Sequence, residues 1–498
     1  MKRSLLPILS LGLSILLVLL SPSFAEGLPD LGESSQTDMS PQMERDIGEA
    51  VMNDIRLREA SFFDDPEVTA YLNEIGRRLA AQSDDARQEF EFFTLRDSTL
   101  NAFAMPGGFI GVHTGLIQAA ASESELASVL AHEISHVTQR HLARQLRPQA
   151  QSQMVALMSF AVALLASRNR PDLAQGAIMA GQGAAMQNQL SYSRDFEREA
   201  DRIGLALQER AGFDVRGMSS FFGRMEKFGR LYEGNTPSYL KTHPLTTERM
   251  TDVENRILQR PYRQVPDSLS FTLVRAKLSA LDGTPQDALA TFRGQIAEQK
   301  FSSPIAARYG LALALSRTKN YVEAETVLQE VRKTKATSPM FETLAADLKL
   351  KQGDPIAGLD ILRSANTAYP QNRAIAYMLV ENLVLARNLT EALKITTREL
   401  QSYTTDAKMY ELQARTYAGL GKQLQQHRAL AEAYVNYGQH GAAIEQLLLA
   451  QKATDGDFYE HSQVDSRLRQ LRAEEEVRKR QEQNQPLRWN LKGEHHEF

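Results

Sequence analysis

The stretch His132-Glu133-Ile134-Ser135-His136 carries the residues best suited to chemistry in this sequence. On a helix, His132 and His136 are four residues apart, so both imidazoles leave the same face and can hold one cation. Neutral imidazole is a good ligand for Zn²⁺. Glu133 lies between them, where it can take a proton from a water molecule that the metal activates. The spacing predicts a metal-dependent hydrolase; the alternative is two histidines on an ordinary helix surface.

A catalytic zinc ion needs a third protein ligand and one open position. The best source is the acidic segment Glu197-Arg198-Glu199-Ala200-Asp201. On a helix, Glu197 and Asp201 share one flank, whereas Glu199 lies on the other. Helical geometry alone leaves the choice between Glu197 and Glu199 open. The alternative to any ligand role is an acidic, solvated helix face.

Two expected helices position these residues. Ser122 and Glu125 have the spacing of a capping box, which predicts that a helix begins here and continues to about residue 142. A second amphipathic helix is expected over 197–208. His141 lies five residues beyond His136, off the expected ligand face, so it is interpreted as structural.

The surrounding N-terminal region mixes helix and strand patterns. Helices are expected at 41–58, after Ser40-Pro41, and at 66–81; strands are expected at 89–95, 101–104 and 109–113. The last two strands flank Pro106-Gly107-Gly108, a turn sequence. The region is therefore predicted to be α+β, with a small sheet.

The second half contains only helical patterns with a repeat. Ala288, Ala324, Gly358 and Ala392 recur in similar surroundings at intervals of 36, 34 and 34 residues. A 34-residue period with a turn residue ahead of a small helical residue resembles the tetratricopeptide repeat (TPR), which builds an α-solenoid. The next period falls on Gln426, so we expect an irregular or register-shifted end. The alternative is a generic helical bundle.

Composition narrows the class of protein. The 498 residues hold 57 Lys and Arg against 61 Asp and Glu, a net charge of −4, which gives no basic excess for nucleic acid. Cysteine is absent, which excludes disulfides, thiolate metal sites and Cys nucleophiles. A globular, multidomain, mainly α protein is expected.

The first 25 residues have the features of a secretory signal peptide. Lys2 and Arg3 precede an apolar run over 5–20, and a small-x-small motif ends at Ala25. An uncleaved membrane anchor is the alternative. The expected organisation is a signal peptide at 1–25, a leader at 26–40, a metalloprotease domain at 41–262, a TPR domain at 267–475 and a charged tail at 476–498, which includes His495-His496.

Three motifs together resemble the M48 zinc metallopeptidases: Asn-Ala-Phe-Ala-Met-Pro-Gly-Gly at 101–108, His-Glu-Ile-Ser-His at 132–136 and Glu-x-x-x-Asp at 197–201. The resemblance implies a gluzincin fold with one Zn²⁺ per chain and Glu197 as its third ligand. It also implies Asp201 as an auxiliary acid that donates a proton. A carboxylate that orients a ligand His would explain Asp201 equally well.

The resemblance extends to Thr242-His243-Pro244, followed by Arg249. A neutral His243 at the metal edge can fill the fourth zinc position and keep the protease latent. Once displaced by substrate, it can donate to the oxyanion of the tetrahedral intermediate. The alternative is an ordinary loop histidine before a proline turn.

The segment Asn101, Ala102, Phe103 and Ala104 resembles the edge strand of this family beside the metal. Such a strand binds an extended substrate by main-chain pairing. A plain hairpin is the alternative. The apolar run at 154–166, with the small-residue stretch at 177–185, is too short to span a bilayer. It is interpreted as a buried helix or as a lid at the cleft.

The signal peptide and the TPR array narrow the resemblance to periplasmic M48 proteases that assist the assembly of outer-membrane β-barrels. It implies a periplasmic zinc endopeptidase and chaperone-like quality-control factor. Its partners would be unfolded or stalled outer-membrane proteins and, through the TPR domain, their assembly machinery, with no nucleic acid and at most peripheral membrane contact. The alternative function is a TPR scaffold or chaperone with a latent protease site.

Overall fold

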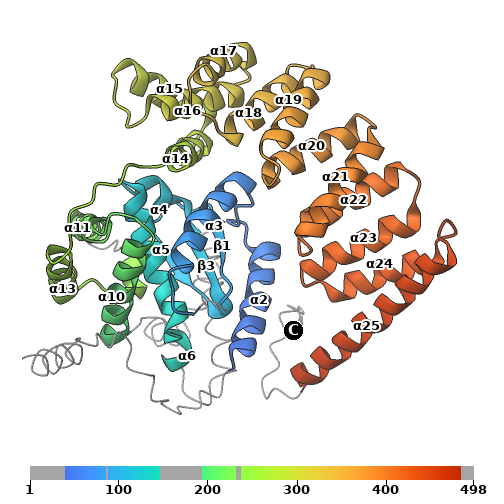
Figure 1. Cartoon of the computed structure of the whole chain (residues 1–498), viewed down its shortest axis with the longest axis horizontal. Coiled ribbons are helices and arrows are strands. Elements are labelled where there is room, and N and C mark those ends of the chain that lie inside the picture. Colours follow the sequence, from blue (N-terminus) through green and yellow to red (C-terminus); the bar gives the residue numbers. More distant parts are fainter. Residues whose placement is uncertain (1–39, 86–87, 146–192, 232–236, 484–498) are drawn as a thin grey trace, which may run out of the picture.

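The computed structural model describes residues 40–85, 88–145, 193–231 and 237–483 (Figure 1). Several sequence predictions lie outside these residues: the signal peptide at 1–25, the leader at 26–39, the segments at 154–166 and 177–185, and His495-His496. Among the described residues, no helix is both long and apolar enough to cross a membrane.

The N-terminal domain begins with two capped helices and a three-stranded sheet. Ser40 and Asp65 accept backbone N–H bonds at the starts of α2 (Pro41–Arg58) and α3 (Pro66–Ala80). The strands are β1 (Glu91–Leu95), β2 (Ala102–Ala104) and β3 (Phe109–His113), in the order β1-β3-β2. β3 is parallel to β1 and antiparallel to β2, so β2 lies at an edge.

The turn between β2 and β3 requires glycine. Gly107 and Gly108 in η1 (Pro106–Gly108) have φ of 73° and 88°, a left-handed conformation that glycine adopts without steric cost. A Cβ on Gly108 would lie 2.0 Å from the carbonyl oxygen of Glu89. The turn therefore packs closely against the backbone just before β1.

Helices cover both faces of the sheet. Phe93 and Leu95 of β1 point toward α2, whereas Phe92 points toward α3 and α5. The remaining helices of the domain are α4 (Thr114–Ala119), α5 (Glu123–Thr138), α6 (His141–Gln145), α10 (Arg194–Arg210), α11 (Arg216–Leu231), α12 (Ser238–Thr242) and α13 (Thr247–Leu258). α5 is central, and every residue from Glu123 to His136 is buried.

The predicted helix through residue 142 ends earlier than expected. Ser122 caps α5 as predicted, by accepting the N–H of Glu125, but α5 ends at Thr138. Arg140 has φ of 52°, a left-handed conformation that stops the helix. Its side chain forms an ion pair with Glu44 of α2, which holds the break in place. α6 then begins at His141.

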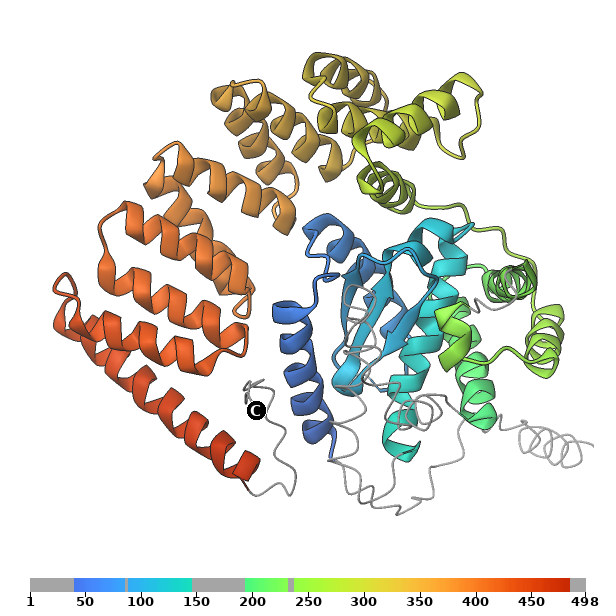
Figure 2. The same ribbon diagram turned by 180° about the vertical axis from the view of Figure 1, so that it is seen from behind.

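The second half is an array of antiparallel helix pairs that curves around the N-terminal domain (Figures 1 and 2). Its helices are α14 (Leu269–Leu281), α15 (Pro285–Ala297), α16 (Pro304–Arg317), α17 (Tyr321–Arg332), α18 (Pro339–Lys351), α19 (Pro355–Ala368), α20 (Arg373–Leu385), α21 (Leu389–Ser402), α22 (Ala407–Gly419), α23 (Gln423–Asn436), α24 (His440–Lys452) and α25 (Phe458–Gln483). The four small residues singled out from the sequence are buried in α15, α17, α19 and α21. The α-solenoid is thereby confirmed.

The expected register shift near the end of the array is present, one period beyond Ala392. Turns with a left-handed residue occur at Gly283, Lys319, Gly353, Arg387 and Gly421, which are 36, 34, 34 and 34 residues apart. The 34-residue period therefore continues through the pair α22 and α23. The next left-handed turn residue, Gly438, comes after only 17 residues, and buried Ala443 follows it in α24, so the array shifts by half a period there. Gln426 need not be small, because buried alanines elsewhere in α23 let the neighbouring helices approach.

The predicted start of the charged tail, at 476, lies inside α25, which continues to Gln483. Glu475 pairs with Arg478 and Lys479, at the (i, i+3) and (i, i+4) spacings that stabilise an exposed helix. The first residues of the predicted charged tail are therefore helical.

Both ends of the array contact the N-terminal domain. At the first end, Lys277 of α14 pairs with Asp65 and Glu67 at the start of α3, each at 2.6 Å. At the far end, the turn between α23 and α24 meets α2: a Cβ on Gly438 would lie 2.1 Å from Nδ2 of Asn53. The array therefore has a defined position relative to the N-terminal domain.

Candidate metal centre

The central helix α5 brings His132 and His136 together. Their Nε2 atoms are 3.0 Å apart, and both side chains are buried. Because α5 is enclosed on all sides, neither imidazole can turn away to water. The two nitrogens therefore face a common point, as their spacing predicts.

Helix α10 supplies the carboxylate. Glu197 Oε1 lies 3.5 Å from His136 Nε2, and Oε2 lies 3.5 Å from His132 Nε2. The two helices cross closely at Gly204, where a Cβ would lie only 3.1 Å from the backbone nitrogen of His132. Glu199 points away from this cluster. Of the two candidates that the sequence left open, the structure brings Glu197 to the histidines.

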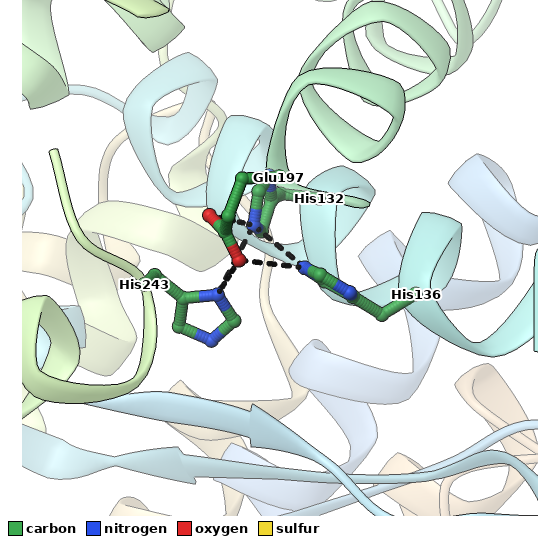
Figure 3. A group of neighbouring side chains, drawn as sticks. All are labelled: His132, His136, Glu197 and His243. Atoms are coloured by element: carbon green, nitrogen blue, oxygen red, sulfur yellow. Dashed lines mark hydrogen bonds and ion pairs between the residues drawn. The ribbon is translucent and has the colours of Figure 1, made fainter. Parts of the chain in front are cut away.

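His243, at the end of α12, completes the group. Its Nδ1 lies 2.9 Å from Glu197 Oε1 and 3.3 Å from His132 Nε2 (Figure 3). Its ring stacks on buried Tyr239, with centroids 4.6 Å apart and an interplanar angle of 27°. His243 is itself 1% exposed. An ordinary loop histidine would be solvated, so its position speaks against that alternative.

The four residues fit a zinc ion. Their ligand atoms all lie within 4.8 Å of one another. The imidazole nitrogens face each other at distances where two lone pairs repel unless a proton or a cation lies between them. A donor set of histidine nitrogens and one carboxylate, without sulfur, is typical of catalytic zinc.

The electrostatics of the cluster favour a cation. Burial alone would raise the pKa of Glu197, but His243 and hydrogen bonds from His132 and His136 hold it well below the usual range. Burial would likewise lower the pKa of His132, but hydrogen bonds to Asp201 and Glu197 raise it to about 10. Burial keeps the pKa of His136 low. The negative potential at His132 that retains a proton also attracts a metal ion.

Asp201 and Arg249 lie behind the ligands. Asp201 Oδ1 is 3.0 Å from Nδ1 of His132, on the side of the ring away from the cluster. Arg249 donates to both Asp201 oxygens at 2.7 and 2.8 Å and to the Pro244 carbonyl at 2.8 Å, and it pairs with Glu197 Oε2 at 2.5 Å. Although burial opposes it, the charge of Arg249 lowers the pKa of Asp201. Asp201 is thus an ionised partner of a ligand imidazole.

Glu133 is completely buried beside the cluster. Oε1 lies 3.4 Å from Nε2 of His243. Burial raises the pKa of the Glu133 carboxyl, while His243, His132 and the Ala104 backbone amide oppose the rise. A raised pKa brings a carboxylate closer to the operating pH, as a general base requires.

The edge strand passes this base. β2 covers Ala102 to Ala104, one residue shorter than expected, and packs against α5. Asn101 precedes it, with its carbonyl accepting the N–H of His113. Since β2 pairs with β3 on one side only among the described strands, its other side is an edge near Glu133.

The site also contains residues that sequence reasoning gave no role. His141 is completely buried, with Nδ1 only 2.9 Å from Nδ1 of His136. Straight helical geometry places it off the ligand face, but the break at Arg140 turns it back. Tyr239, which holds the ring of His243, lies just before the Thr-His-Pro motif and carries no local signal of its own. Both positions depend on chain geometry that periodicity does not encode.

Known proteins resemble this chain over most of its length. Residues 66–257 match peptidase family M48. The β-barrel assembly-enhancing protease of Yersinia pestis is 30% identical over 451 residues, which are 89% of this chain and 91% of that protein. The protein of that name from Escherichia coli K12 is 30% identical over 461 residues, 91% of this chain and 93% of that protein.

Two further matches are partial. The mitochondrial metalloendopeptidase OMA1 of Schizosaccharomyces pombe is 30% identical over 219 residues, 44% of this chain and 60% of that protein. The crystal structure of the TPR protein YrrB covers 36% of this chain and 91% of that chain at 18% identity, with a TM-score of 0.28, too low to add to the helix-pair geometry above. On the nearly full-length similarity and the donor set, this chain belongs to peptidase family M48 as a zinc metallopeptidase with a C-terminal TPR array.

Proposed function

We propose that this protein is a periplasmic zinc endopeptidase that acts on outer-membrane β-barrel proteins. The observation that carries the proposal is the buried group of His132, His136, Glu197 and His243 beside Glu133. The proposed ligands are His132, His136 and Glu197, which hold one zinc ion per chain. When bound, zinc lowers the pKa of water and polarises the scissile carbonyl.

The residues of the chain perform the proton transfers. Glu133 takes the proton of the attacking water and later delivers it to the leaving amine. Asp201 holds the ring of His132 through Nδ1, which supports an orienting role over proton donation to substrate. β2 binds the substrate as an added strand, next to Glu133.

His243 keeps the protease latent in this proposal. Nδ1 occupies the fourth position of the cluster, and Nε2 faces the carboxylate of the general base, 3.4 Å away. One side chain thus obstructs both the open position and Glu133. A substrate must displace this histidine, which can then donate to the oxyanion.

The names of the relatives suggest the substrate class. Two nearly full-length relatives are named β-barrel assembly-enhancing proteases. Unfolded or stalled β-barrel proteins have unpaired strand edges, which suit main-chain pairing with β2. The TPR array would bind these clients or their assembly machinery on its concave face. Export by the signal peptide at 1–25 would place the protein in the periplasm.

The test compares wild type with Glu133→Gln on a purified, urea-unfolded outer-membrane β-barrel protein. Glutamine keeps the size and an acceptor oxygen but cannot take the proton. We expect one zinc per chain in both proteins and a loss of cleavage by about 10²–10⁴ in the variant. Undiminished cleavage by Glu133→Gln would remove Glu133 from the mechanism.

The closed site also favours a second candidate, a TPR chaperone with a mostly latent protease. Each of the four cluster residues is at most 2% exposed. In the same experiment, aggregation of the client is followed by light scattering. Suppression of aggregation by both proteins, without cleavage by wild type, would favour the chaperone function.

A further inference from the structure

His141 occupies a position that the proposed mechanism does not use. It begins α6, directly after the left-handed residue Arg140. Its ring stacks on Phe196 in the first turn of α10, with centroids 4.5 Å apart and an interplanar angle of 12°. The imidazole is thus clamped between the helix that carries the histidine pair and the helix that carries the carboxylate.

Both nitrogens of His141 have polar partners. Nδ1 lies 2.9 Å from Nδ1 of His136, and Nε2 lies 3.0 Å from Oε2 of Glu199. Arg144 donates to the same Glu199 oxygen at 3.0 Å. A continuous chain of contacts therefore leads from His136 through a second imidazole to a carboxylate at the protein surface.

The chemistry of these groups sets the direction of each hydrogen bond. His136 turns Nε2 to the cluster, where it must offer a lone pair to a cation, so its proton is on Nδ1. His141 accepts that N–H at Nδ1, and its own proton is therefore on Nε2. Nε2–H in turn donates to Glu199, which as a carboxylate can only accept.

We propose that His141 is a positioning residue, which fixes the tautomer and ring orientation of the zinc ligand His136 and links it to Glu199. His132 has a carboxylate directly at its outer nitrogen, from Asp201. His136 reaches its carboxylate only through another imidazole, because Glu199 lies on the far flank of α10. Partners of this kind hold a ligand ring in place and make it more basic. The proposal rests on the ligand role of His136 proposed above.

A purely structural reading of His141 makes a different prediction. If the ring only fills space against Phe196, a phenyl ring will replace it without effect on the metal. His141→Phe keeps the aromatic stack but removes both hydrogen bonds. Phe196→Leu does the reverse, because it removes the stack and leaves the nitrogens of His141 in place. The two variants therefore separate packing from positioning.

The experiment measures zinc affinity on the full-length, metal-free chain by competition with a chromophoric chelator. We expect zinc binding to weaken by about 10–100-fold in His141→Phe and to change by less than about 3-fold in Phe196→Leu. His141→Gln, whose amide offers one acceptor and one donor, should recover part of the loss. Co²⁺ in place of zinc should show an altered visible spectrum in His141→Phe.

A substitution of Glu199 tests the proposal independently. Glu199→Gln keeps an acceptor oxygen but loses the charge, and we expect zinc affinity to fall by up to about 10-fold. Its matched control is Glu209→Gln, another acid of α10 paired with an arginine, Arg260, far from the cluster. The control should bind zinc like wild type.

Wild-type zinc affinity and Co²⁺ spectrum in folded His141→Phe would overturn the proposal. If circular dichroism shows that this variant does not fold, Glu199→Gln decides: affinity equal to that of Glu209→Gln overturns the proposal, and weaker binding supports it. If the proposed zinc site itself is wrong, the results differ from these. Either the wild-type protein binds no zinc, or His136→Ala still binds zinc.

Discussion

The two halves of the molecule differ in where their charged side chains lie, buried in one and mostly exposed in the other. The N-terminal domain buries Glu133, Glu197, Asp201 and Arg249 within a few ångströms of one another. The TPR array keeps most of its ion pairs at the surface, as between Arg293 and Glu323. Isolated buried charges are costly unless they are paired or bind a metal. Substitutions of these buried charges should therefore change zinc binding and cleavage, whereas substitutions in the packed interior of the array should change stability and leave zinc binding intact.

The largest expected effect comes from His136→Ala. Removal of one of three zinc ligands should leave less than one-tenth of the zinc after dialysis, because ligand number dominates metal affinity, and cleavage should fall to background. Metal content is read by mass spectrometry. The matched control is His427→Ala in the array, where Nδ1 of His427 lies 2.8 Å from Oε1 of Gln446. Zinc loss in this control would contradict the difference between the halves.

His243→Ala distinguishes latency from transition-state stabilisation. If His243 keeps the site closed for about nine-tenths of the time, its removal should increase cleavage about 10-fold. If it only donates to the oxyanion, cleavage should drop about 10²–10³-fold. Proteolysis is compared at equal zinc content. An unchanged rate would mean that His243 is neither gate nor donor.

The junction between the halves contains a largely buried ion pair. Lys277, with 13% of its side chain exposed, pairs with Asp65 and Glu67. Lys277→Met leaves two acids without their cation, which should destabilise the protein by about 3 kcal/mol. Denaturant unfolding at pH 7 measures the loss. An unchanged midpoint would show that the junction does not contribute.

The same ion pair predicts a pH dependence. Burial would lower the pKa of Lys277, but Glu67 and Asp65 raise it above its ordinary value of about 10.4. A raised pKa stabilises the fold fully below that ordinary value, and the contribution is lost as pH rises through the folded value. The stability difference between wild type and Lys277→Met should therefore be constant from pH 7 to 9.5 and shrink above about 10.5.

The smallest effect is expected inside the array. Ala324 is completely buried where two helices approach, whereas Val322 on the same helix is 76% exposed. Ala324→Leu should destabilise the protein by about 1–3 kcal/mol through overpacking, and Val322→Leu by less than about 0.5 kcal/mol. Neither variant should alter zinc content. Zinc loss in Ala324→Leu would mean that array packing reaches the metal centre.

Local sequence patterns were sufficient to predict most of the helices and strands. The Ser40 and Ser122 caps, the aromatic-rich strand at Glu91–Leu95 and the 34-residue interval between turns are all short-range features, and each appears in the structure. The placement of His132 and His136 was predicted equally well, since the four-residue spacing on a helix sets both rings on one face. These predictions succeeded because neighbouring residues alone determine the geometry.

Tertiary structure decided everything that depends on distant segments. Glu197 and Glu199 are equivalent by local pattern, and only the close crossing of α10 and α5 at Gly204 brings one of them to the histidines. His243 is more than a hundred residues from His132, yet it lies 3.3 Å away because its ring stacks on Tyr239. His141 lies next to His136 because the chain turns at one left-handed residue, Arg140, which forms an ion pair with Glu44. Sequence periodicity describes which face of an element is buried, whereas the partner of that face is chosen by packing between elements.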